Sequence, residues 1–161
     1  MDVTGEHLIR AAIDVGGLLP NARAALQRMG DEAFIAISGE LDQSSLDSSQ
    51  RVNALRALSL ISASTENMPL RKDEVLERAL TMSTSDDRVV RSAAVHVGIW
   101  TAAMLEDLGR PAPKERMGVV IRKAIRLGLD PAVVKLAQGF LRGEAPPVDI
   151  IEIEVRPPHS T

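Results

Sequence analysis

Apolar residues recur at spacings of three and four along most of the chain, which is the spacing of one face of an α-helix. Polar capping residues, glycines and prolines interrupt this pattern at intervals. The pattern therefore predicts an all-α fold with about eight helices. The predicted helices cover residues 4–16, 21–30, 31–39, 50–62, 70–83, 85–108, 114–128 and 130–143.

Short polar side chains stand where several of these helices begin. We expect Thr4 to cap the first helix, Ser48 or Ser49 the fourth, and residues 85–87 the sixth. In each case a side-chain oxygen can accept a hydrogen bond from a free backbone amide of the first turn. The eighth helix is expected to start at Asp130, because a proline suited to the first turn follows it.

The segment "SDDRVVRSAAVHVGIWTAAML", residues 85–105, contains the longest run without a charged residue. The fourteen residues from Ser92 to Leu105 carry no formal charge, but at ~1.5 Å per residue they are too few to cross a bilayer. Apolar side chains occur on both sides of this helix, which indicates a central helix covered by its neighbours. We interpret His96 and Trp100 as packed core residues rather than as a polar pocket.

Two of the predicted helices have similar sequences. "SSQRV" (residues 48–52) matches "SDDRV" (residues 85–89) at an offset of 37 residues. A second alignment, of "QRVNALRALSLI" with "VVRSAAVHVGI", shifts the offset to 40 residues. Internal similarity at such a period is typical of helical repeat proteins.

The segment "VVRSAAVHVGI" resembles the second helix of a HEAT repeat, and the resemblance covers residues 48–109. It implies a short HEAT-like stack of antiparallel helix pairs, with Arg91 and either Asp86 or Asp87 in polar contacts between repeats. A single-domain helical bundle unrelated to HEAT repeats is the alternative. In either fold we expect a helical domain at residues 1–143.

Residues 144–161 form a tail with a different pattern. The apolar positions Ile151, Ile153 and Val155 alternate with glutamates, which is the periodicity of a strand, and a proline pair stands on either side. A lone strand needs a partner for its backbone groups, such as the tail of another protomer or a sheet edge of another protein. A disordered chain end is the alternative interpretation.

The composition supports helices and narrows the chemistry. The 161 residues include only two Phe, one Trp and no Tyr, so Leu, Ile, Val and Ala must fill the core. The absence of Cys excludes disulfides, thiolate metal sites and a thiol nucleophile. The N-terminus lacks the basic start of a signal peptide, which predicts a cytoplasmic protein, and fifteen Arg against four Lys suggest a bacterial source.

Charge is distributed unevenly along the chain. Residues 31–50 hold five carboxylates and no base, whereas residues 110–142 hold eight bases and two acids. Four cations of the predicted seventh helix lie within about a third of its circumference. They are Arg116, Arg122, Lys123 and Arg126. This stripe could bind an acidic protein or phosphates, dock the chain's own residues 31–50, or be a solvated surface.

The stretch "AIRLGLDPAVVKLAQG", within residues 114–142, resembles a bacterial helix-turn-helix. Ala124, Gly128 and Val134 have the spacing of that motif's inner small residue, turn glycine and packing residue. The resemblance implies a recognition helix that presents four side chains to a DNA groove. These are Ala132, Lys135, Gln138 and Arg142. Lys123 departs from the motif, which usually has an apolar residue there, and Asp130 would repel phosphate.

Motifs of catalysis are absent from the sequence. Glycine-rich phosphate loops, the His-Glu-x-x-His helix and the Gly-x-Ser-x-Gly elbow do not occur, and the three His are far apart. We therefore predict a protein–protein interaction module, such as an adaptor, inhibitor or immunity-type factor, without catalytic activity, metal or cofactor, and able to self-associate through the tail. A DNA-binding regulator is the first alternative, and a small enzyme assembled from distant loops is the second.

If neighbouring helices cover the uncharged segment, the fluorescence of Trp100 is that of a buried indole. We expect a native emission maximum at a shorter wavelength than in the unfolded chain, and weak quenching by iodide. Free quenching in the native protein would contradict a central position for this helix.

Overall fold

In the computed structural model, the described part of the chain comprises residues 2–43, 45–63 and 69–146, and its regular elements are all α-helices. The predicted all-α fold is confirmed, with eight helices in these residues. They are α1 (Val3–Asp14), α2 (Pro20–Met29), α3 (Asp31–Leu41), α4 (Ser48–Ala63), α5 (Pro69–Met82), α6 (Arg88–Asp107), α7 (Lys114–Leu127) and α8 (Pro131–Leu141).

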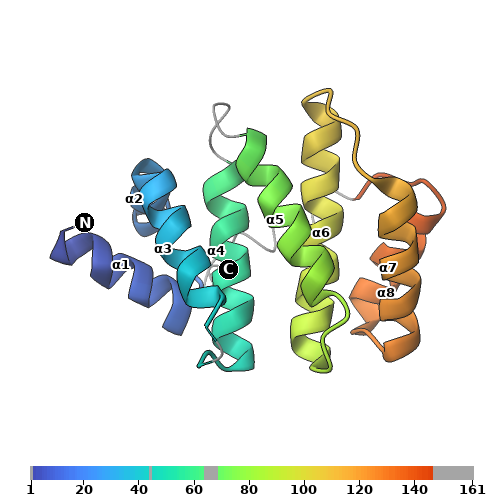
Figure 1. The fold of residues 1–161 in the computed structure, drawn as a ribbon, viewed down its shortest axis with the longest axis horizontal. Coiled ribbons are helices and arrows are strands. Elements are labelled where there is room, and N and C mark those ends of the chain that lie inside the picture. The colour runs from blue at the N-terminus through green and yellow to red at the C-terminus, as the bar shows by residue number, and fades with distance from the viewer. Residues whose placement is uncertain (1, 44, 64–68, 147–161) are drawn as a thin grey trace.

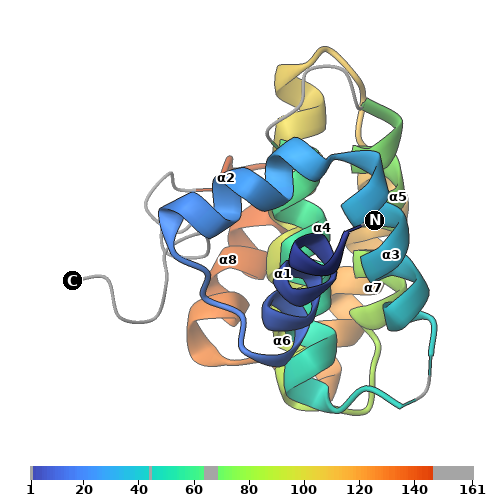
Figure 2. The same cartoon turned by 90° about the vertical axis from the view of Figure 1, so that its left-hand side faces the viewer.

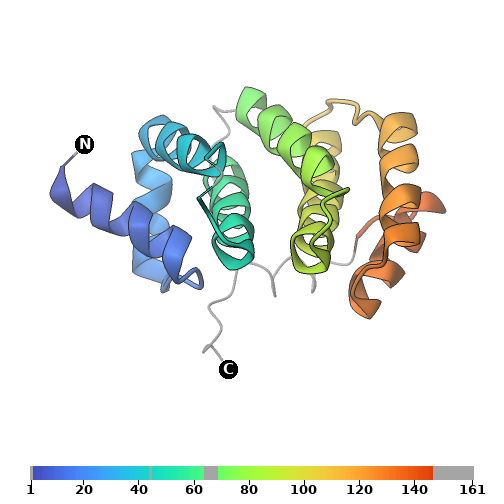
Figure 3. The ribbon, with the colours of Figure 1, turned by 60° about the horizontal axis from the view of Figure 1, so that its bottom comes forward.

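The helices are arranged as successive antiparallel pairs. Figure 1 shows α3 with α4, α5 with α6, and α7 with α8, one pair after another across the molecule. The second helices form a row, because α4 contacts α6 and α6 contacts α8 (Figure 3). At the N-terminal end, α1 and α2 pack on both helices of the first pair (Figure 2). The α7–α8 pair stands at the opposite end of the stack.

The caps of two helices differ from the sequence-based expectation. At the start of α1, the backbone N–H of Gly5 donates to the Asp2 carboxylate at 2.7 Å, so Asp2 and not Thr4 caps this helix. At the start of α4, the backbone N–H of Gln50 donates to the Asp47 carboxylate at 2.8 Å, while Ser48 and Ser49 are already helical residues. In both cases a carboxylate stands just before the expected serine or threonine, and its negative charge is the better partner for the positive end of the helix dipole.

Helices α4 and α6 correspond at an offset of 40 residues rather than 37. Asp87 accepts hydrogen bonds at the start of α6 as Asp47 does at the start of α4. At an offset of 40, Val52 corresponds to Ser92, and both are buried. At an offset of 37, Val52 would correspond to Val89, which is 57% exposed. Burial therefore separates two alignments that the sequence leaves open.

Helix α6 is the centre of the stack, as its uncharged segment predicts. Thirteen of its 20 residues are buried, and Trp100 is only 7% exposed. One side, with Val90 and Val97, belongs to a core shared with α1–α5. The other, with Ile99 and Leu105, belongs to a second core shared with α5, α7 and α8. Among the described residues, no helix is both long enough and apolar enough to cross a membrane.

Ion pairs connect the first helices of successive pairs. Two join α5 to α3 and two join the α7 region to α5. These pairs are Arg71–Asp31 (3.0 Å), Arg78–Asp42 (2.7 Å), Arg110–Asp73 (2.6 Å) and Arg116–Glu77. All are partly exposed, so each stabilises the fold by about 1 kcal/mol at most. Their main effect is to fix the register between neighbouring pairs.

A buried arginine connects α6 to the last pair. Arg91 is 5% exposed, and its guanidinium donates to three backbone carbonyl oxygens. Two of these belong to the end of α7, Gly128 at 2.7 Å and Leu127 at 3.0 Å, and the third is that of Ser85 before α6, also at 2.7 Å. Gly128 has a φ of +105°, which favours glycine and turns its carbonyl toward Arg91. Arg91 thus holds the α7–α8 turn against the start of α6.

We expect Arg91→Ala to lower the free energy of unfolding by about 3 kcal/mol, because three partly buried carbonyls lose a charged donor. Chemical denaturation monitored by circular dichroism measures this change. Arg88→Ala is the matched control: Arg88 forms an exposed ion pair with Asp130 at 3.2 Å and one long hydrogen bond, 3.3 Å, to the Leu129 carbonyl, so its loss should cost only about 1 kcal/mol. Equal losses in the two variants would refute the role given to Arg91.

Candidate interaction surface

The predicted basic stripe lies on the outer face of α7. Arg116, Arg122, Lys123 and Arg126 are all exposed, while Met117, Ile121 and Ala124 on the opposite side are buried. Two exposed apolar residues share the outer face, Val119 at 63% and Leu127 at 47%. The surface of α7 therefore combines positive charge with apolar area.

The four cations of the stripe differ in their partners. Arg116 pairs with Glu77 of α5, and this hydrogen bond raises the pKa of the arginine. Arg122, Lys123 and Arg126 form no ion pair within the part of the chain that the structure describes. Arg116 therefore belongs to the contacts of the stack, and the other three are available to a ligand.

One alternative interpretation of the stripe is wrong. The acidic residues 31–50 do not dock on α7, because their carboxylates have partners elsewhere. Asp31 and Asp42 pair with arginines of α5, Glu40 pairs with Arg10, and Asp47 caps α4. The sequence shows that the charges are segregated, but only the fold shows that the two regions lie in different pairs.

At the ninth position of the helix, α7 has a cation and α5 has an acid. Arg71 and Arg116 are the third residues of α5 and α7, and each pairs with an acid of the preceding first helix, Asp31 and Glu77 respectively. Glu77 is the ninth residue of α5, and the ninth residue of α7 is Arg122. The two acceptors do not hold the same position, because Asp31 is the first residue of α3.

Helix α8 also replaces stacking residues with polar ones. The fifth and eighth residues of α6, Ser92 and Val95, are buried toward the last pair. The fifth and eighth residues of α8, Lys135 and Gln138, are exposed. Among the described residues, Lys135 forms no ion pair. Together with Arg122, Lys123 and Arg126 it makes four such cations at this end of the stack.

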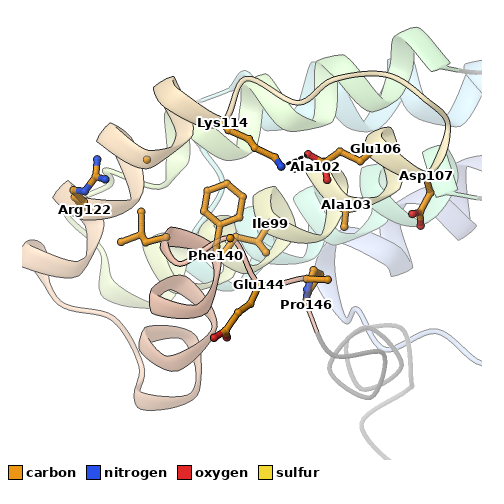
Figure 4. Close-up of a pocket in the computed structure, with 14 residues that line it drawn as sticks. Ile99, Ala102, Ala103, Glu106, Asp107, Lys114, Arg122, Phe140, Glu144 and Pro146 are labelled. Carbon is orange, nitrogen blue, oxygen red and sulfur yellow. Dashed lines mark ion pairs between the residues drawn. The ribbon is translucent and has the colours of Figure 1, made fainter.

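A cavity opens beside the basic stripe, between α6, α7, α8 and residues 143–146 (Figure 4). Its volume is about 330 Å³. Its apolar lining comes from α6 and α8 and consists of Ile99, Ala102, Ala103, Phe140 and Leu141. The position of this cavity could not be predicted from the sequence, because its lining residues come from three helices and a connecting segment.

Charged side chains surround this apolar lining. Lys114 pairs with Glu106 at 2.9 Å, and Arg122 also lines the cavity (Figure 4). Arg142 binds Glu144 at 3.0 Å, which lowers the pKa of that carboxyl. A Cβ at Gly118 would come within 3.3 Å of the Arg122 guanidinium, so the glycine leaves room for this side chain beside the cavity. Glu106, Asp107 and Glu144 also line the cavity, so its apolar part can take an apolar side chain, whereas a site for an acid lies only toward Arg122 and the basic face of α7.

The residues of the helix-turn-helix resemblance have mixed environments. Ala124 is buried, Gly128 has a positive φ, Val134 is half-buried, and the predicted recognition residues of α8 are exposed. However, Asp130 stands at the start of α8, where its backbone N–H donates to Ser92 Oγ at 3.0 Å. The beginning of α8 is thus held against α6 and carries a carboxylate, which disfavours a phosphate there.

Asp73 and Glu74 are neighbouring acids of α5, and their carboxylates form ion pairs with different arginines. Asp73 pairs with Arg110, whereas Glu74 pairs with Arg71 of its own helix, so the two side chains point apart. No group of three or more His, Asp or Glu residues within the described ranges could hold a metal ion. The predicted partner-binding residues Ile151, Ile153 and Val155 lie outside the described residues.

Comparisons of the chain with protein-family models, with curated proteins and with solved structures find no match in any of the three.

His96 of α6 is half-buried rather than fully buried in the core. Its burial lowers its pKa to about 4, with a further contribution from the positive charge of Arg56. The imidazole is therefore neutral at physiological pH in the folded protein. In the unfolded chain its pKa returns to about 6.5.

The free energy of unfolding should fall as the pH is lowered from 6.5 to 4, since only the unfolded chain binds a proton at His96 in this window. The contribution of His96 is about 3 kcal/mol at most. His96→Gln should remove it, which urea denaturation at a series of pH values would show as a smaller acid-induced loss than in the wild type. His7→Gln is the control, because His7 is exposed; an identical pH dependence in wild type and His96→Gln would contradict the expected effect.

Proposed function

We propose that this protein is a non-catalytic binding module, of the adaptor, inhibitor or immunity type, that binds an acidic protein partner through the α7–α8 end of its stack. One observation carries the proposal. Arg122, Lys123, Arg126 and Lys135 are exposed at this end without an ion pair among the described residues, whereas Asp31, Asp42 and Glu77 already pair with arginines of the stack. The four cations outnumber the one acid of α7, Glu115, so this surface is net positive and can attract carboxylates of a partner.

The same surface supplies both steering and anchoring. Exposed cations attract an acidic partner over roughly a Debye length, ~8 Å at physiological salt, and increase the rate of association. The guanidinium of Arg122 can bind a carboxylate with two parallel hydrogen bonds. The adjacent cavity and the exposed Val119 offer apolar contact. Apolar anchors next to charged pairs are the usual arrangement of a protein interface.

DNA binding through α8 is the second candidate. The exposure of Lys135, Gln138 and Arg142 along one helix favours it, because these side chains could contact base edges or phosphates. The carboxylate of Asp130 at the start of α8 and its pairing with Arg88 weigh against it. The two candidates require different ligands of the same basic surface, so one set of variants tests both.

The test measures fluorescence anisotropy of two labelled probes, a glutamate-rich peptide containing leucine and a short duplex DNA. We expect the peptide to bind, and Arg122→Glu or Arg126→Glu to weaken its binding about tenfold, since each variant replaces an attraction with a repulsion. Arg28→Glu is the matched control: it makes the same change in net charge at an exposed site on α2, in the opposite part of the stack.

Equal losses in all three variants would show that only net charge matters and would refute a site on α7. Binding of the duplex but not of the peptide, with the same dependence on Arg122 and Arg126, would replace the proposal by DNA recognition.

A further inference from the structure

The cavity beside α7 is lined partly by the end of the described chain. Gly143, Glu144, Ala145 and Pro146 form one of its walls, next to Phe140 of α8 (Figure 4). The segment that follows Pro146 therefore begins at the edge of the cavity. Fifteen residues of sequence follow this point.

The sequence of these residues complements the surface. In "VDIIEIEV", residues 148–155, apolar residues alternate with glutamates from Ile151 to Val155, and residues 147–161 contain three acids against one arginine. In an extended conformation, alternate side chains point to opposite sides, so apolar and acidic groups would separate. The described surface has the matching properties, an apolar cavity beside Arg122, Lys123 and Arg126.

The length of this segment also matches that of the surface. Eight extended residues span about 26 Å. Helix α7 has 14 residues, and a helix of that size is about 21 Å long. Eight residues are therefore long enough to reach from the cavity to the cations of α7. Because they are covalently attached next to it, their effective concentration at the site is in the millimolar range.

We propose that residues 148–155 of this chain occupy the cavity and the basic face of α7, and that they compete there with the acidic partner. Ile151 and Ile153 supply the apolar contact from one side of the segment, and Glu152 and Glu154, on its other side, bind the cations. The competition rests on the proposed function, whereas docking of the segment does not. The C-terminal segment thus acts as an internal inhibitor, which a partner must displace.

Docking is tested in the full chain with a spin label. The chain contains no Cys, so Pro157→Cys provides a unique attachment site. The label should broaden the backbone amide NMR signals of Val119, Arg122 and Arg126, but not those of α1. The matched control has residues 148–155 in scrambled order, which preserves length and charge and removes the alternation. It should lose most of this broadening, as should Ile151→Ser combined with Ile153→Ser.

Two outcomes would overturn docking within one chain. Equal broadening in the scrambled control would mean that any acidic tail attached there has the same effect. Broadening in a mixture of isotope-labelled protein and spin-labelled, isotope-free protein would assign the contact to a second copy.

Competition is tested with the glutamate-rich peptide and the full chain. Ile151→Ser with Ile153→Ser should increase the affinity for this peptide about tenfold, because the site is no longer occupied. Unchanged affinity, with docking shown by NMR, would refute the inhibitory role and leave the proposed function intact. Docking without any peptide binding in either chain would instead refute the proposed function.

Discussion

The position of the last helix pair depends on the buried guanidinium of Arg91. A buried charge is stable only when its donors are satisfied, and Arg91 satisfies them with carbonyls from two separate parts of the chain, the segment before α6 and the end of α7. The α7–α8 pair therefore cannot shift against α6 without exposing or orphaning that charge. Because α6 is apolar on both sides, it joins this pair to the N-terminal core. The geometry of the basic surface is thus set from within the stack.

The exposed ion pairs have a different consequence. They contribute little free energy, but they use the acids of α3 and α5 to hold the arginines of the next pair. The sequence of donors and acceptors stops at α7, where Arg122 stands in place of an acid. Arg122, Lys123 and Arg126 of α7 and Lys135 of α8 form no ion pair among the described residues. This difference between α5 and α7 underlies the proposal of an acidic ligand.

The proposed partner and the proposed internal inhibitor share one chemical description. Both place apolar side chains beside Phe140 and Ile99 and carboxylates beside Arg122 and its neighbours. Salt weakens the ionic part of such an interaction, because the cations are exposed. It does not weaken the apolar part. In this proposal, a covalently attached competitor of moderate affinity would keep such a surface from binding weak acidic ligands. A partner that offers better apolar contacts can still displace it.

The sequence by itself determined the helices, the central position of α6, the stripe on α7 and the exposed face of α8. These features depend on periodicity and on local capping chemistry, which are properties of short segments. It did not determine the offset of 40 residues between α4 and α6, the partners of the acids in residues 31–50, or the division of the stripe between Arg116 and the free cations. Those depend on which side chains meet across different helices. Only the tertiary structure decides that, because similar local patterns are compatible with several ways of packing the same helices.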